Sequence, residues 1–131
     1  MHAHLVMAEA ATRHPDGTVS MLRAGITHLW AEKPPWTLNG ALVVHLGTDP
    51  PDKGQHEFQL ECMDQDGKSV LPAVKGQFMA PQGRSTTNLV IGLSMRFEQP
   101  GPHTFYFTVD KVQRGEWTLQ CAVPPQREGA G

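Results

Sequence analysis

The chain has 131 residues, the usual length of one domain, and its 11 Lys and Arg against 13 Asp and Glu leave a formal net charge of -2. This balance argues against a nucleic-acid binder, because affinity for a phosphate backbone comes from clustered Lys and Arg. A hydrophobic fraction of 39% excludes a disordered chain, and 13 Gly with 11 Pro indicate many turns.

Alternation of apolar and polar residues is the dominant pattern of the chain, and it predicts strands. In chain order, strands are expected at 3–8, 19–24, 26–31, 38–46, 58–62, 74–78, 89–97, 105–109 and 117–123. The first three and 74–78 have the weaker patterns. Segments 19–24 and 26–31 can alternatively form one strand that bends at Gly25.

Turn-forming residues separate these segments. Residues 7–13 include helix formers, but the turn His14–Gly17 follows them, so no helix is predicted. A second turn is expected at Asp64–Gly67, and 111–115 is expected to connect the last hairpin. About eight strands with turns at this spacing predict an all-β fold. We expect an antiparallel β-sandwich, immunoglobulin-like in architecture, with a small β-barrel as the alternative.

The domain is expected to span 1–125 and to end in a flexible tail at 126–131. Residues 1–12 lack the pattern of a signal peptide, and no apolar run approaches the length of a membrane helix. These features predict a cytoplasmic protein without membrane contact. Cys62 and Cys121 both fall on the apolar register of a strand. They either point into the core as small hydrophobic residues or face each other and form a disulfide.

Several motifs also follow one another in a recognisable order. Ala-Glu-Ala-Ala leads into an Asp-Gly-hydrophobic hairpin within 8–19, and the aromatic-ended strand 26–30 precedes a Pro-rich loop and a long strand. An Asp-x-Asp-Gly turn at 64–67 and a Pro-Gly-x-His-x-Phe strand at 100–105 complete the series. This order resembles a family of small bacterial proteins assigned to a domain of unknown function. The resemblance implies a stand-alone cytoplasmic β-domain and transfers no catalytic residues.

Histidines are the residues most suggestive of metal chemistry, since the chain has seven of them. His2 and His4 would share one face of a strand, and His28 or His45 could add a third ligand. Histidines scattered over strand faces need no metal, however, so no metal site is favoured. The sequence has no nucleophile elbow, P-loop or dinucleotide fingerprint. We therefore predict a protein that is not an enzyme and has no cofactor.

Exposed aromatic residues give the remaining indication of function. Trp30 and Trp36 flank the loop 31–35, and Tyr106 lies on the outward register of its strand. If exposed together, these side chains form an interaction patch; alternatively, both tryptophans cover the open end of the sandwich.

The leading hypothesis is a non-enzymatic intracellular module that acts through protein–protein interaction. It would be a homo-oligomer or a subunit of a larger assembly, phage-like particles included. The alternative is a small-ligand or carbohydrate-binding sandwich in which Trp36 and Tyr106 stack on sugar rings.

Overall fold

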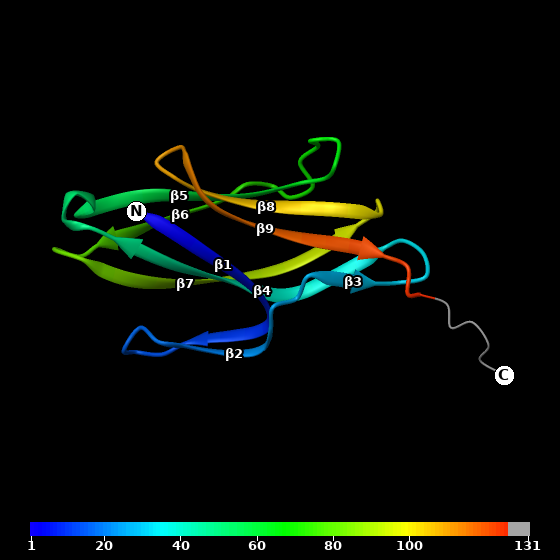
Figure 1. Cartoon of the computed structure of the whole chain (residues 1–131), viewed down its shortest axis with the longest axis horizontal. Coiled ribbons are helices and arrows are strands. Elements are labelled where there is room, and N and C mark those ends of the chain that lie inside the picture. Colours follow the sequence, from blue (N-terminus) through cyan, green and yellow to red (C-terminus); the bar gives the residue numbers. More distant parts are fainter. Residues whose placement is uncertain (126–131) are drawn as a thin grey trace.

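Two packed β-sheets make up the computed structural model, which describes residues 1–125 (Figure 1). The expected tail at 126–131 lies outside the described residues. Sheet A has the strand order β2 (Val19–Ala24), β1 (His2–Arg13), β4 (Trp36–Thr48) and β7 (Ser85–Phe97). Sheet B has the order β3 (His28–Trp30), β9 (Val112–Ala122), β8 (Gly101–Val109), β5 (Gly54–Met63) and β6 (Val74–Ala80).

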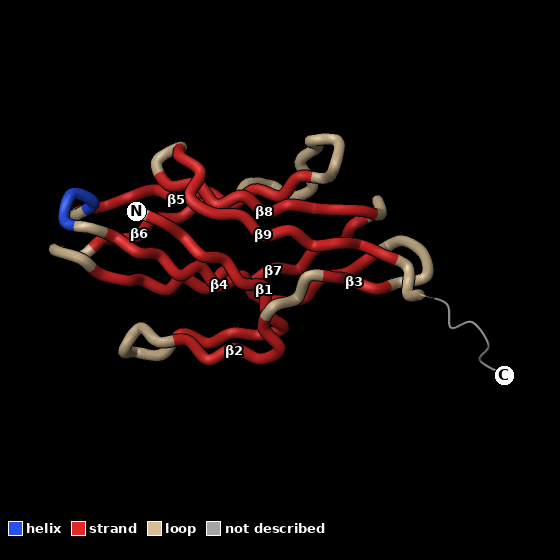
Figure 2. Tube along the Cα trace, viewed as in Figure 1, coloured by secondary structure: helices blue, strands red, loops and turns tan. Residues whose placement is uncertain are grey.

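The predicted all-β sandwich is confirmed. Each expected strand is present, and the described residues contain a single short 3-10 helix at Pro50–Asp52 (Figure 2). The order β9-β8-β5-β6 opposite β4-β7 is that of an immunoglobulin-type sandwich, so the immunoglobulin-like architecture holds and the barrel alternative does not. Every pairing is antiparallel except that of β3 with β9.

Two local expectations are corrected by the pairing. Segments 19–24 and 26–31 do not form one bent strand, because β2 belongs to sheet A and β3 to sheet B. The last hairpin turns at Asp110 and Lys111, both with positive φ, so β9 already begins at Val112. The sequence 111–115 therefore belongs largely to a strand. A bulge interrupts the alternation of apolar and polar residues in this segment. Phe107 pairs with Gly115 and Thr108 with Gln113, so Arg114 has no partner opposite it on β8.

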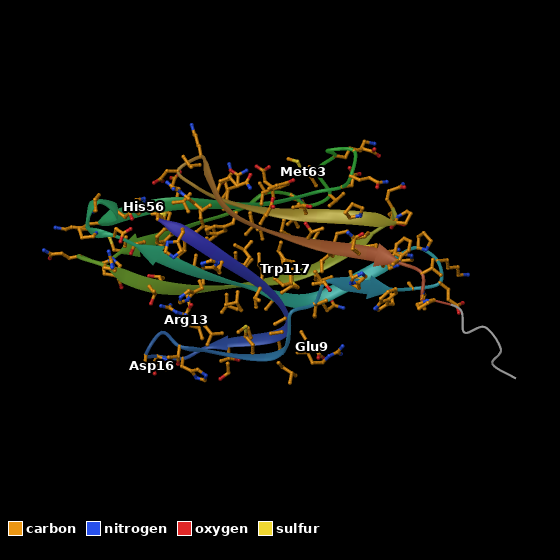
Figure 3. All side chains as sticks on the ribbon, viewed as in Figure 1. Glu9, Arg13, Asp16, His56, Met63 and Trp117 are labelled. Atoms are coloured by element: carbon orange, nitrogen blue, oxygen red, sulfur yellow. The ribbon has the colours of Figure 1, made fainter. Side chains whose placement is uncertain are left out.

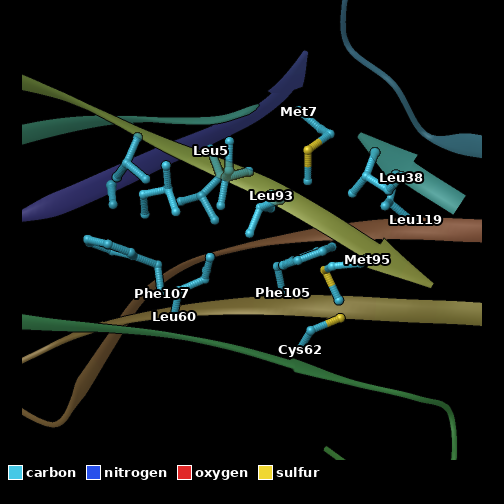
Figure 4. Close-up of a cluster of buried hydrophobic side chains, with 14 of the residues drawn as sticks. Leu5, Met7, Leu38, Leu60, Cys62, Leu93, Met95, Phe105, Phe107 and Leu119 are labelled. Atoms are coloured by element: carbon cyan, nitrogen blue, oxygen red, sulfur yellow. The ribbon is translucent and has the colours of Figure 1, made fainter. Parts of the chain in front are cut away.

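The core lies between the two sheets and is formed by the inward residue of each alternating pair. Phe105 and Phe107 of β8 and Leu60 of β5 are fully buried. Figure 4 shows that these side chains from sheet B meet Leu5 and Leu93 of sheet A. Complete burial of a side chain of this size stabilises the fold by about 1.5–3 kcal/mol. The alternation seen in the sequence thus places the core correctly.

Cys62 and Cys121 are both buried and both free, which confirms the first of the two expectations for them. They lie on β5 and β9, the two neighbours of β8 in sheet B. Strands that are two positions apart in a sheet are separated by about 10 Å, which exceeds the reach of a disulfide. The alternative of a disulfide across the sandwich is therefore wrong.

A hairpin that we call the arm, residues 9–24, extends sheet A. Strand β1 pairs with β4 only up to Ala8 and with β2 from Ala8 onward. The arm folds back along the outer face of sheet A (Figure 1), and Asn88 Nδ2 on β7 donates a hydrogen bond of 3.0 Å to Gly17 O in its turn. Val43, an outward residue of β4, is consequently only 5% exposed.

Candidate interaction site

The departure of β1 leaves part of one strand without a neighbour. Strand β4 pairs with β7 along its whole length, from Trp36 to Thr48, but with β1 only from Ala41 to Gly47. Over residues 36–40, one edge of β4 therefore has no ladder partner within the described part of the chain. We call this edge and the groove beside it the edge slot. Unpaired strand edges expose backbone N–H and C=O groups that other strands can use.

Gly40 marks the point where the two strands separate. A Cβ atom at this position would lie 2.6 Å from the backbone oxygen of Ala8. The absence of a side chain at Gly40 therefore permits the close approach at which β1 turns away from β4. The edge slot begins immediately beyond this contact.

The edge slot opens into a groove of about 360 Å³. His28 and Trp30 of β3 form one wall, and Thr37 and Asn39 lie on the β4 side. The Trp30 side chain is 55% exposed, and its ring stacks on the His28 ring with centroids 5.0 Å apart at 11°. The groove thus combines a backbone edge with a large, partly fixed aromatic surface.

The arm closes one end of the groove. Glu9 of β1, labelled in Figure 3, and Arg23 of β2 line the groove there. The two side chains form an ion pair of 3.5 Å. Both side chains are well exposed, so this pair contributes little to stability. Its charges are accessible for contact with a partner.

The proposed aromatic patch is not assembled as the sequence suggested. Trp36 is only 2% exposed, and its Nε1 donates a hydrogen bond of 3.0 Å to the carbonyl of Ala122. Because Trp36 takes the inward register of β4, it covers the end of the core and cannot belong to an exposed patch. The alternative expectation, that both tryptophans cover the open end of the sandwich, is correct for Trp36 but not for Trp30, which is exposed.

Tyr106 also lies apart from Trp30. It faces outward on β8 and pairs with Glu116 of β9, whereas Trp30 pairs with Ala122 of the same strand. These two positions of β9 are six residues apart, or about 20 Å along a strand. Of the three predicted patch residues, only Trp30 therefore lines the groove of the edge slot.

The weak metal candidates His2 and His4 do share the outer face of sheet A. Their rings make an edge contact with centroids 5.4 Å apart, and His45 lies opposite His4 on β4. Nδ1 of His45 is 2.6 Å from Oδ1 of Asn88. Within residues 1–125, no three His, Cys, Asp or Glu side chains are placed to hold a metal ion. Likewise, no helix in that range is long and apolar enough to cross a membrane.

The two thiols are poor nucleophiles in this structure. Burial raises the pKa of Cys62 to about 12 and that of Cys121 to about 11. Thiolate, the reactive form, is therefore scarce near neutral pH. This chemistry agrees with the interpretation of both residues as core side chains.

One polar cluster was not found from the sequence. His56 of β5 has Nδ1 2.6 Å from Oδ2 of Asp110 and Nε2 beside the carbonyl of Asp52. The hydrogen bond to Asp110 raises the pKa of His56, and the same bond lowers the pKa of Asp110. Since both ring nitrogens face acceptors, the imidazolium form links the loop after β4 to the turn after β8. Asp52 is close to His56 in sequence, but Asp110 is 54 positions away, so no local signal indicates the complete cluster.

This cluster makes stability depend on pH in a defined direction. Because the pKa of His56 is raised, its contribution to the free energy of unfolding is fully present below the ordinary pKa of 6.5. This contribution is lost as pH rises through the raised value. His103 acts oppositely, because burial lowers its pKa: its contribution to stability is present above 6.5 and is lost as pH falls through the lowered value. The loss of unfolding free energy in His56→Gln, relative to wild type, should therefore be larger at pH about 5.5 than at about 8.5. Urea unfolding at both pH values measures it, and equal losses would contradict this role of His56.

Together, the strand order and the edge slot define a small immunoglobulin-like sandwich with an open strand edge beside an exposed tryptophan. The chain belongs to a family of unknown function (DUF6941), whose model matches residues 3–122. The resemblance noted in the sequence, to a family with a domain of unknown function, is thus confirmed. Comparisons with curated proteins and with solved structures gave no match.

Proposed function

We propose that this protein is a non-enzymatic binding module that takes up an extended segment of a partner protein at the edge slot. The observation that carries the proposal is the unpaired edge of β4 over residues 36–40. A segment that adds to a free edge gains main-chain hydrogen bonds, and neighbouring pockets read its side chains. Five residues of strand extend over about 17 Å, which accommodates a short linear motif.

Trp30 supplies the side-chain part of this recognition. Tryptophan is enriched among residues that dominate binding energy, because it buries a large rigid surface at small entropic cost. Trp30 is 55% exposed and lies against the groove, so a bound segment would cover it. At the arm end, the exposed Glu9–Arg23 pair offers hydrogen-bond donors and acceptors to the bound segment.

The partner is either a second copy of the chain or another subunit of an assembly, phage-like particles among them. We place the protein in the cytoplasm, because two free cysteines such as Cys62 and Cys121 stay reduced there. Native mass spectrometry of the purified protein separates the two kinds of partner. A defined multiple of the chain mass indicates self-association, and a co-purifying chain identifies another subunit.

Replacement of Trp30 by alanine tests the proposal at the edge slot. Affinity for the partner should fall about thirtyfold or more, because a hot-spot truncation costs about 2 kcal/mol or more. The melting temperature should hardly change, since the side chain is largely exposed. Titration calorimetry with the identified partner, or the dimer dissociation constant from sedimentation, provides the measurement.

Met79→Ala is the matched control, because Met79 is 63% exposed but lies on β6, outside the slot. It should bind as wild type does. Unchanged affinity in Trp30→Ala, or an equal loss in Met79→Ala, would show that the edge slot is not the binding surface.

A further inference from the structure

A second concave surface lies on the opposite side of the molecule, on the outer face of sheet B. It is a hollow of about 590 Å³ over β5, β6 and β8. Its polar lining comes from outward-facing residues of three neighbouring strands: Glu57 and Gln59 of β5, Lys75 and Gln77 of β6, and Thr108 of β8. The ladder places Glu57 opposite Gln77, and Gln59 between Lys75 and Thr108. We call this surface the polar hollow.

The charges around the polar hollow cancel. Glu57 and Asp110 contribute two carboxylates, and Lys75 and Lys111 contribute two ammonium groups. A site for an ion would carry an excess of the opposite sign, which is not the case here. The other polar lining groups are amides and a hydroxyl, which both donate and accept hydrogen bonds, and Phe58 and Gly76 complete the lining. This combination suits a ligand without net charge that itself has many donors and acceptors.

Several of these polar groups are held in place before any ligand binds. Gln55 Nε2 donates to Gln77 Oε1 at 2.5 Å, and Gln59 Nε2 donates to Glu61. Asp110 is fixed at the rim by His56 and by the backbone N–H of Glu57, which donates to Asp110 Oδ1 at 3.1 Å. Groups that are fixed on strands lose little entropy on binding.

An aromatic side chain borders the same surface. Tyr106 is two residues before Thr108 on β8 and therefore faces the same side of the sheet, about 7 Å away. It is partly exposed and pairs in the ladder with Glu61. A flat aromatic ring beside amides and carboxylates provides a surface on which the apolar face of a sugar ring can stack.

We propose that the polar hollow binds an uncharged oligosaccharide. Its hydroxyl groups would be hydrogen-bonded by Gln59, Gln77 and Thr108, and one ring would stack on Tyr106. This inference is independent of the edge slot, because the two surfaces lie on different elements. The sequence suggested that a carbohydrate stacks on Trp36 and Tyr106. Trp36 is buried and cannot do so, whereas Tyr106 lies beside the polar hollow.

NMR titration of the isotope-labelled full chain tests the proposal, with maltohexaose, cellohexaose and chitohexaose as probes at millimolar concentrations. At least one of them should cause saturable shifts centred on the amides of Gln59, Gln77 and Thr108. The variants Gln77→Ala and Tyr106→Ala should each weaken that binding about tenfold, or about 1.4 kcal/mol. Gln120→Ala is the matched control, since Gln120 lies on β9 of the same sheet outside the polar hollow, and it should bind as wild type does.

Three results would overturn the proposal. The first is an absence of shifts with all three probes. The second is a set of shifts centred on other residues, the edge slot included. The third is equal affinity in wild type and Gln77→Ala, a variant in which only an exposed side chain is shortened. Failure of Trp30→Ala to affect partner binding has no bearing on this test, so the two proposals fail separately.

Discussion

Replacement of Trp36 by alanine is expected to lower the free energy of unfolding by about 3–5 kcal/mol. The ring is buried where β4 begins, opposite Phe97 of β7, and it closes the end of the core. Its Nε1 also ties β4 to the carbonyl of Ala122 in the last strand of the other sheet. Because domains are stable by only about 5–15 kcal/mol, this one change removes a large share of stability. Chemical unfolding monitored by far-UV circular dichroism measures the loss.

Two further variants separate the causes of this loss. Trp36→Phe keeps one aromatic ring but removes the N–H donor and part of the buried indole, and should cost about 1–2 kcal/mol. Ala122 O still accepts the backbone N–H of Ala31 at 3.1 Å, so no carbonyl is left unpaired. Trp30→Ala removes an exposed tryptophan six positions earlier and should leave the unfolding midpoint nearly unchanged. Equal midpoints for Trp36→Ala and wild type would contradict the buried position of Trp36.

The second large effect is expected at Gly115, where the edges of the two sheets meet. A Cβ atom there would lie 2.8 Å from the backbone oxygen of Ala3 and 2.7 Å from Cδ1 of Leu5. A backbone atom of β1 cannot give way as a side chain can, so Gly115→Ala should force β1 and β9 apart. Overpacking of this kind costs about 1–3 kcal/mol. Thermal unfolding followed by calorimetry provides the measurement.

Gly92 supplies the control for this substitution. It lies in β7, and a Cβ atom there meets nothing within 4 Å. Gly92→Ala should therefore stabilise the protein by about 0.5–1 kcal/mol, through the smaller entropy of the unfolded chain. A loss of stability in Gly92→Ala, or none in Gly115→Ala, would show that the β1–β9 approach does not determine the effect.

Periodicity accounts for much of what could be predicted. Alternation is a local property, so the strands around Leu42, Leu60 and Phe105 were found together with the side that each one buries. The same logic placed Cys62 and Cys121 in the core. Trp36 was misjudged because it stands next to Pro35, where the alternating pattern of β4 is hard to recognise, although it continues the inward register of Leu38.

The candidate sites depended on pairing, which the sequence does not encode locally. The edge slot exists because β1 pairs with β4 only up to Ala8 and with β2 from there on. Nothing in the composition of 2–13 indicates this change of pairing partner. Gly40 was a possible signal, since glycine within a strand often marks a close backbone approach. The polar hollow requires β6, β5 and β8 to be neighbours in that order, which only the tertiary structure specifies.

Strand β3 is made early but is paired late. Its ladder partner is β9, and Trp117 Nε1 on that strand donates to the carbonyl of Ile26 across 91 positions of sequence. Contacts of such separation form only after a long loop has closed, which slows folding. At a synthesis rate of about 5–20 residues per second, a nascent chain would wait on the order of ten seconds between the two strands. During that interval β3 has no ladder partner, because β9 has not yet been made.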